Sequence, residues 1–146
     1  MSSEAVVHLI DDDAGGRLAF ARMLEAAQFN VRTYESAVAF LKILPNVEPG
    51  CIVTDFQMPQ IDGLVLIRRL RDLGSNMPVI VISGSGDVSL PAKAVSAGAI
   101  GFLEKPLNAE LLITWIRSAL TCIECSGAPE TMPLEEQRPG MVAPLL

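Results

Sequence analysis

The chain has 146 residues, of which 50% are hydrophobic, and its formal net charge is −6. This length is typical of one domain, and the negative charge disfavours a nucleic-acid-binding surface on this chain. No apolar run is long enough to cross a membrane, and the start, Met1-Ser2-Ser3-Glu4, lacks the basic residues of a secretory signal. These features predict a soluble cytoplasmic protein without membrane contact.

Short apolar strands alternate with helices along most of the chain. The predicted strands are 5–10, 30–34, 51–55, 78–82 and 100–103, and the predicted helices are 14–27, 36–44, 64–73, 89–97 and 108–120. This alternation predicts an α/β fold in which helices cover both faces of a doubly wound parallel sheet. In a flavodoxin-like (βα)5 arrangement the five strands have the order 2-1-3-4-5.

Composition changes near the end of the chain. Prolines recur after Ser126 and hydrophobic periodicity disappears. We therefore assign residues 1–121 to one domain and residues 122–146 to a proline-rich tail or linker. A lone Cys-x-x-Cys, formed by Cys122 and Cys125, has no second pair that would complete a closed zinc site, so we predict no metal or redox role for it.

Polar residues stand where four of the predicted strands end. The first predicted strand leads into Asp11, Asp12 and Asp13. The third, fourth and fifth end at or near Asp55, Ser83 and Lys105, respectively. The carboxyl ends of parallel strands meet at one edge of the sheet, and in open α/β sheets ligands bind there. We therefore expect an acidic cluster flanked by a hydroxyl group and an ammonium group.

Several carboxylates close together repel one another unless a cation lies between them. A hard divalent ion with oxygen ligands, such as Mg²⁺, suits an acidic site that also receives phosphate oxygens. An aspartate can attack phosphorus to form an aspartyl phosphate, and charge stabilisation of this kind drives phosphoryl transfer. The pattern therefore indicates phosphoryl chemistry at Asp55.

The motifs at these strand ends resemble those of a known family. They are Leu9-Ile10-Asp11-Asp12, Val53-Thr54-Asp55 with Met58-Pro59 and Asp62-Gly63, Val81-Ile82-Ser83-Gly84, and Phe102-Leu103-Glu104-Lys105-Pro106. In this order, over about residues 5 to 121, they resemble a response-regulator receiver domain of two-component signalling. The segment from Ser83 to Val88 most resembles receivers of the nitrogen-fixation transcription-regulator type.

The resemblance implies a role for each of these residues. Asp55 is the phosphoacceptor, and Asp12 and Asp55 bind Mg²⁺ (or Mn²⁺), with Asp11 acting through water and the Gln57 backbone carbonyl as a further ligand. It also implies contacts from the phosphoryl group to Ser83, Gly84 and Lys105. It implies a switch role for Ser83 and Phe102, and a cis peptide bond between Lys105 and Pro106.

The resemblance also implies partners and an output. A sensor histidine kinase or a phosphotransfer protein supplies the phosphoryl group. Phosphorylation then switches a face formed by the fourth helix, fifth strand and fifth helix, which mediates homodimerisation or partner binding. Such a receiver catalyses its own phosphorylation and dephosphorylation weakly and is not an enzyme in the usual sense. No DNA-binding motif follows the predicted domain in this sequence.

Two alternatives use the same residues differently. A phosphatase of the haloacid dehalogenase type also has an aspartate nucleophile and Mg²⁺, but it needs a second aspartate two residues later, where this chain has Gln57. A protein-binding module that keeps the fold without phosphorylation is the other alternative. His8 lies inside a predicted strand, so we interpret it as a core residue and not as a phosphate relay.

Overall fold

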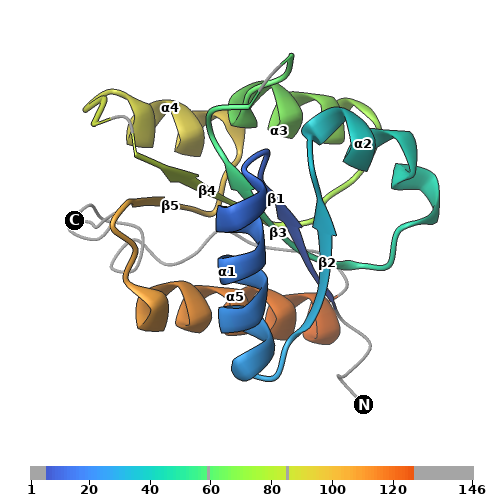
Figure 1. The fold of residues 1–146 in the computed structure, drawn as a ribbon. Helices are drawn as coiled ribbons and strands as arrows, with labels where there is room; N and C mark the ends of the chain where they lie inside the picture. The colour runs from blue at the N-terminus through green and yellow to red at the C-terminus, as the bar shows by residue number, and fades with distance from the viewer. Residues whose placement is uncertain (1–5, 59, 85, 127–146) are drawn as a thin grey trace.

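The computed structural model describes residues 6–58, 60–84 and 86–126. A five-stranded parallel sheet has the order β2-β1-β3-β4-β5, which confirms the predicted flavodoxin-like topology. Helices lie on both faces of the sheet (Figure 1). The strands are β1 Val6–Ile10, β2 Asn30–Tyr34, β3 Gly50–Asp55, β4 Val79–Ser83 and β5 Gly101–Glu104, and the helices are α1 Ala14–Ala26, α2 Ala37–Lys42, α3 Gly63–Asp72, α4 Leu90–Ala97 and α5 Ala109–Ser126.

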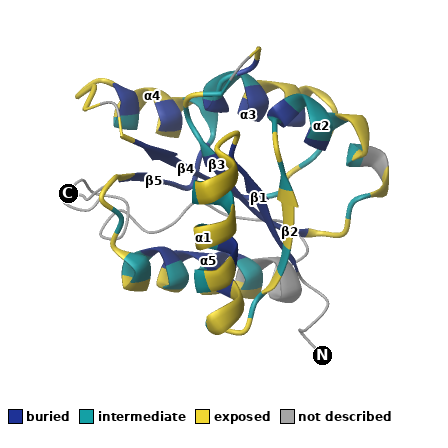
Figure 2. Ribbon diagram, in the orientation of Figure 1, coloured by how far each residue is buried: buried dark blue, intermediate teal, exposed yellow. Residues whose placement is uncertain are grey.

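Two apolar layers sandwich the sheet because alternate strand residues point to opposite faces. On one face Val7, Val53 and Ile82 pack with residues of α1 and α5, including the buried Trp115. On the other face, strand residues that include Phe102 pack with α2, α3 and α4. The central strands are buried while β2, at the edge, is largely exposed (Figure 2). This double burial explains the uninterrupted apolar sequence of the central strands.

Most helix ends follow from local sequence signals. The Ser36 side chain accepts a hydrogen bond from the Ala39 N–H group at the start of α2, and Asn108 accepts one from Leu111 at the start of α5. Gly98, with a φ angle of +116°, ends α4 in a left-handed conformation that suits glycine. The second predicted helix is shorter than expected, since α2 ends at Lys42 and a separate 3-10 helix spans Leu44–Asn46.

The last helix extends beyond residue 121, where we placed the domain boundary, and reaches Ser126. Residues 121–126 contain no glycine or proline, so the sequence offers no helix-breaking residue before Gly127. Most of the proposed proline-rich tail, residues 127–146, lies outside the described residues. Within the described part of the chain, no helix has the length and apolar character that a membrane crossing requires.

Candidate functional site

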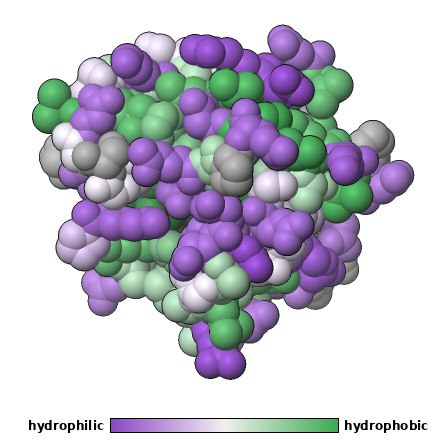
Figure 3. Space-filling view, turned by 45° about the horizontal axis from the view of Figure 1, so that its top comes forward, coloured by the Kyte–Doolittle hydropathy of each residue, from purple (hydrophilic) through white to green (hydrophobic). Residues whose placement is uncertain are grey.

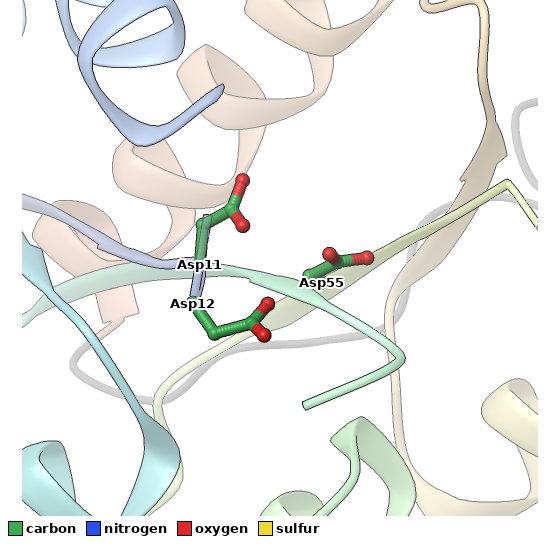
Figure 4. Close-up of side chains that lie close together, drawn as sticks. All are labelled: Asp11, Asp12 and Asp55. Carbon is green, nitrogen blue, oxygen red and sulfur yellow. The ribbon is translucent and has the colours of Figure 1, made fainter. Parts of the chain in front are cut away.

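Three carboxylates meet at the edge of the sheet where β1 and β3 end. β1 and β3 are parallel neighbours, with Ile10 opposite Thr54, so the residues that follow, Asp11 and Asp55, lie side by side. The side chains of Asp11, Asp12 and Asp55 lie close together (Figure 4). One oxygen atom from each of the three lies within 4.8 Å of the others. The sheet topology thus brings together acidic residues that are more than forty positions apart.

Backbone contacts hold the end of β1 in place. The Asp11 N–H group donates to the Tyr34 carbonyl oxygen at 3.2 Å, which continues the pairing of β1 with β2. The Asp11 side chain, which is buried, accepts a hydrogen bond from the Asp13 N–H group at 3.0 Å. The guanidinium group of Arg17 donates to the Asp11 carbonyl oxygen at 2.7 Å. These contacts fix the chain direction at the point where it enters the site.

Asp13 has a different role from its two neighbours. Its carboxylate accepts a hydrogen bond from the Gly16 N–H group at 2.7 Å and caps the amino end of α1. It is absent from the three-carboxylate cluster. Our expectation that all three consecutive aspartates converge was therefore wrong for Asp13. The helix begins immediately after it, and the free N–H groups of a helix start attract a carboxylate.

The electrostatic environment of Asp55 reflects its position between the other charges. Its side chain is 15% exposed, so it is partly withdrawn from water but open to a small reactant. Burial raises the pKa of Asp55, the charge of Lys105 lowers it, and the charges of Asp11 and Asp12 raise it, with a net increase. The site therefore disfavours a third negative charge in the absence of a cation.

Lys105 and Ser83 reach the same edge from β5 and β4. The Lys105 ammonium nitrogen lies 3.7 Å from Oδ2 of Asp55. The Lys105 N–H group donates to the Ser83 carbonyl oxygen at 2.9 Å, and the Ser83 side chain is buried. A Cβ atom added at the exposed Gly84 would lie 3.6 Å from Cδ of Lys105, so Gly84 also borders this group. The Lys105–Pro106 peptide bond is cis.

Two other candidate residues, Phe102 and Gln57, differ in their burial. Phe102 is 1% exposed and belongs to the apolar layer under α2, α3 and α4, so in this structure its ring points into the core. Gln57 is exposed in the loop that follows β3.

His8 is buried on β1, where Nε2 lies 2.8 Å from the Glu48 carbonyl oxygen and Nδ1 lies 2.9 Å from the Tyr34 hydroxyl group. This placement agrees with a structural role for His8.

Two residues shape the site in ways that we did not predict from the sequence: Arg17, and Gly63 of the Asp62-Gly63 motif. Arg17 fixes the Asp11 carbonyl, but its sequence position in an amphipathic helix gives no signal of that contact. At Gly63, an added Cβ would lie 3.3 Å from Cα of Phe56 and 3.4 Å from the Asp55 carbonyl oxygen. Glycine at this position lets α3 begin close behind Asp55. The Asp-Gly pair at 62–63 was a recognisable signal, since Asp62 also caps α3 through the Leu64 and Val65 N–H groups.

The donor set of this site fits a hard divalent cation. Its three close groups are carboxylates, which are the ligands that Mg²⁺ prefers, and their mutual repulsion is relieved by a positive charge. The space-filling view shows hydrophilic side chains gathered across the middle of the face that it draws (Figure 3).

Comparisons with known proteins identify the family of this chain. Residues 7–117 match the response regulator receiver domain family. The transcriptional regulatory protein FixJ of Bradyrhizobium diazoefficiens is 36% identical over 132 residues, which cover 90% of this chain and 64% of FixJ. FixJ of Rhizobium meliloti is 42% identical over 117 residues, covering 80% of this chain and 57% of the relative. The chain thus spans somewhat more than half the length of these relatives.

Solved structures give the same result. A crystal structure of FixJ-N has a TM-score of 0.76 and 42% identity, and the match covers 80% of this chain and 94% of that chain. Full-length FixJ from B. japonicum has a TM-score of 0.79 and 37% identity, with 86% of this chain and 62% of that chain covered. The family match, the sequence identities and the fold agree, and this chain belongs to the response regulator receiver domains of two-component signalling.

Proposed function

We propose that Asp55 accepts a phosphoryl group from a sensor histidine kinase or a phosphotransfer protein in a Mg²⁺-dependent reaction. The observation that carries this proposal is the convergence of Asp11, Asp12 and Asp55, with Lys105 3.7 Å from Asp55, at one edge of the sheet. An aspartate needs a reachable carboxylate oxygen and charge stabilisation around the incoming oxygens to act as a phosphoacceptor. The partial exposure of Asp55 and the ammonium group of Lys105 meet these two needs.

Each neighbour has a distinct part in this reaction. An Asp55 carboxylate oxygen attacks phosphorus, and the bond from phosphorus to the donor breaks. Lys105 balances negative charge on the phosphoryl oxygens, and the Ser83 hydroxyl group and the Gly84 N–H group donate hydrogen bonds to them. Asp11, Asp12, Asp55 and the Gln57 carbonyl oxygen would hold Mg²⁺ (or Mn²⁺). Bound there, the ion neutralises charge on the carboxylates and on the phosphoryl group.

The signal leaves the domain through the residues that follow Ser83. We propose that Ser83 moves toward the phosphoryl group and that Phe102 responds as the switch aromatic, which changes the face formed by α4, β5 and α5. This face would bind a partner or a second copy of the chain. The chain itself would neither bind nucleic acid directly nor contact a membrane, and it would act in the cytoplasm. Apart from weak self-phosphorylation and autodephosphorylation, it would have no enzymatic activity.

A phosphorylation assay tests the proposal. The protein is incubated with Mg²⁺ and either acetyl phosphate or beryllofluoride, and modification of Asp55 is followed by mass spectrometry or by amide chemical shifts. We expect labelling of the wild-type protein and of Asp72→Asn, a variant of an exposed aspartate on α3, and no labelling of Asp55→Asn. The absence of any label or spectral change in the wild-type protein would support a phosphorylation-independent binding module. Turnover of a generic phosphate ester that depends on Asp55 would support a phosphatase.

A further inference from the structure

Arg71, in the last turn of α3, makes a set of contacts that the proposed phosphorylation site does not use. Its Nη1 atom donates to the carbonyl oxygens of Ser75 and Met77, each at 3.1 Å. Its Nη2 atom donates to the Gly98 carbonyl oxygen at 3.2 Å. One guanidinium group thus joins the connection between α3 and β4 to the residue that ends α4.

The surroundings of Arg71 are suited to this bridge. Arginine presents several N–H donors in a rigid planar arrangement, and hydrogen bonds from a charged donor are stronger than neutral ones. Among the described residues, Arg71 forms no ion pair with a carboxylate, so carbonyl oxygens take up its donors. Gly98 lies against α3, since an added Cβ atom would be in ordinary van der Waals contact with it, 3.4 Å from Cγ2 of Ile67 and 3.6 Å from Nε of Arg71.

The amino end of α4 is held differently. Gly84, Gly86, Asp87, Val88 and Ser89 are exposed, and the exposed fraction of Val88 is 92%. Asp87 accepts hydrogen bonds from the Ser89 N–H group at 2.9 Å and from its hydroxyl group at 2.7 Å, which close a turn within the segment. The Ser89 side chain forms no capping hydrogen bond to α4. This exposed segment follows Ser83, which ends β4 and accepts a hydrogen bond from the Lys105 N–H group.

We propose that Arg71 is a positioning residue that anchors the carboxyl end of α4, so that a change at Ser83 displaces the amino end of the helix while Gly98 stays in place. This inference rests on the proposed function for the event that moves the helix, but the anchor itself exists in the unmodified protein. It predicts a gradient of local stability along α4, low near Ser89 and high near Gly98.

Amide hydrogen exchange tests the anchor without phosphorylation. In the wild-type protein we expect the Gly98 and Ala99 N–H groups, which bond to carbonyls of α4, to exchange at least about tenfold more slowly than those of residues 86–90. Arg71→Met removes the three hydrogen bonds and should speed exchange at Gly98 and Ala99 by about tenfold. Arg69→Met, on the same helix at an exposed position, is the control and should change neither rate.

Two outcomes would overturn the anchor. One is equal exchange at the two ends of α4 in the wild-type protein, and the other is unchanged exchange at Gly98 and Ala99 in Arg71→Met. If Arg71→Met does not fold, Arg71→Lys, which keeps the charge but not the planar set of donors, should give an intermediate increase in the exchange rate.

Beryllofluoride with Mg²⁺ then tests the movement. We expect amide shifts at residues 86–90 of the wild-type protein with small shifts at Gly98 and Ala99, and shifts that spread to Gly98 and Ala99 in Arg71→Met. Equal shifts at both ends of wild-type α4 would refute the fixed end. If no amide near Asp55 responds, the proposed function fails, and the exchange gradient alone decides whether Arg71 is an anchor.

Discussion

The ammonium nitrogen of Lys105 lies 3.7 Å from Oδ2 of Asp55, although Asp55 ends β3, Lys105 follows β5, and β4 lies between these two strands. Burial raises the pKa of Asp55, and the charge of Lys105 opposes that increase. The ion pair is partly exposed, so its contribution to folding is small, about 1 kcal/mol or less. Its main consequence is electrostatic, because the charge of Lys105 offsets part of the increase in the pKa of Asp55 that burial, Asp11 and Asp12 cause.

Lys105→Met should raise the pKa of Asp55 further and slow phosphorylation by acetyl phosphate by at least about tenfold, because a charge that stabilises the phosphoryl oxygens is lost. Carbon-13 NMR titration of the Asp55 carboxyl group measures the first effect, and the initial rate of labelling measures the second. Lys42→Met, at an exposed position on α2, is the control and should change neither. An unchanged Asp55 titration in Lys105→Met would mean that the ion pair does not form in solution.

Asp55→Asn should stabilise the protein at neutral pH without Mg²⁺. The folded-state pKa of Asp55 lies above its ordinary value of 3.8, so this group favours folding at low pH and loses that contribution as the pH rises through its folded pKa. Removal of the charge should raise the free energy of unfolding at pH 7 by on the order of 1 kcal/mol, about the energy of two like charges 4 Å apart in water. Urea unfolding at several pH values measures this difference, which should vanish near pH 3.

Mg²⁺ should bind through Asp12 but not through Asp13. Asp12→Asn removes a charge from the carboxylate cluster and should weaken Mg²⁺ binding by about tenfold or more, as measured by titration calorimetry. Asp13→Asn is a matched control, because asparagine caps helices as well as aspartate does and Asp13 lies outside the cluster. Equal loss of affinity in the two variants would indicate that general negative charge, and not the specific cluster, attracts the ion.

Much of this arrangement could be predicted from the sequence because strand ends carry local signals. Buried apolar runs located the strands, and the parallel topology then brought Asp55 and Lys105 to the same edge. The aspartates at 11–13 were harder to separate, since only the geometry of the α1 start distinguishes a helix cap from a metal ligand. The contact from Arg71 to Gly98 joins residues 27 positions apart through a backbone carbonyl, and no side-chain pattern marks it.

His8 should make stability depend on pH in the range where histidine titrates. It is the only histidine in the chain, and burial lowers its pKa below 6.5. The Glu48 carbonyl oxygen accepts from Nε2–H, so Nδ1 of the neutral ring accepts from the Tyr34 hydroxyl group. Protonation of Nδ1 would reverse that hydrogen bond and place a positive charge on a buried ring, which burial disfavours. The unfolded chain therefore binds the proton more readily, and the free energy of unfolding should fall as the pH drops below about 6.5.

Urea unfolding between about pH 5.5 and pH 7.5 measures this slope. His8→Gln should reduce the slope whatever its effect on absolute stability. Tyr34→Phe keeps the histidine but removes the donor to Nδ1, and it should cost about 1 kcal/mol at pH 7.5, where the ring is neutral. A slope in His8→Gln equal to that of the wild-type protein would assign the pH dependence to carboxyl groups.

Gly15 and Gly16 should respond oppositely to alanine, although a sequence-based argument treats them alike as weak positions in a helix. A Cβ atom at Gly15 would lie 3.7 Å from Oδ2 of Asp13, an ordinary contact, so Gly15→Ala should gain up to about 1 kcal/mol of helix propensity. At Gly16 the same atom would lie 2.9 Å from Oδ2 of Asp13 and 3.3 Å from Oδ2 of Asp11.

Gly16→Ala therefore has to displace the Asp13 carboxylate from its capping position and press on the Asp11 carboxylate. The lost cap offsets the gain in propensity, since each is worth about 1 kcal/mol, and the variant should be no more stable than the wild-type protein. Displacement of Asp11 should also weaken Mg²⁺ binding, which Gly15→Ala leaves unchanged. Thermal unfolding and Mg²⁺ titration of both variants test this. If Gly16→Ala gains as much stability as Gly15→Ala and binds Mg²⁺ equally well, then the start of α1 does not constrain the carboxylate cluster.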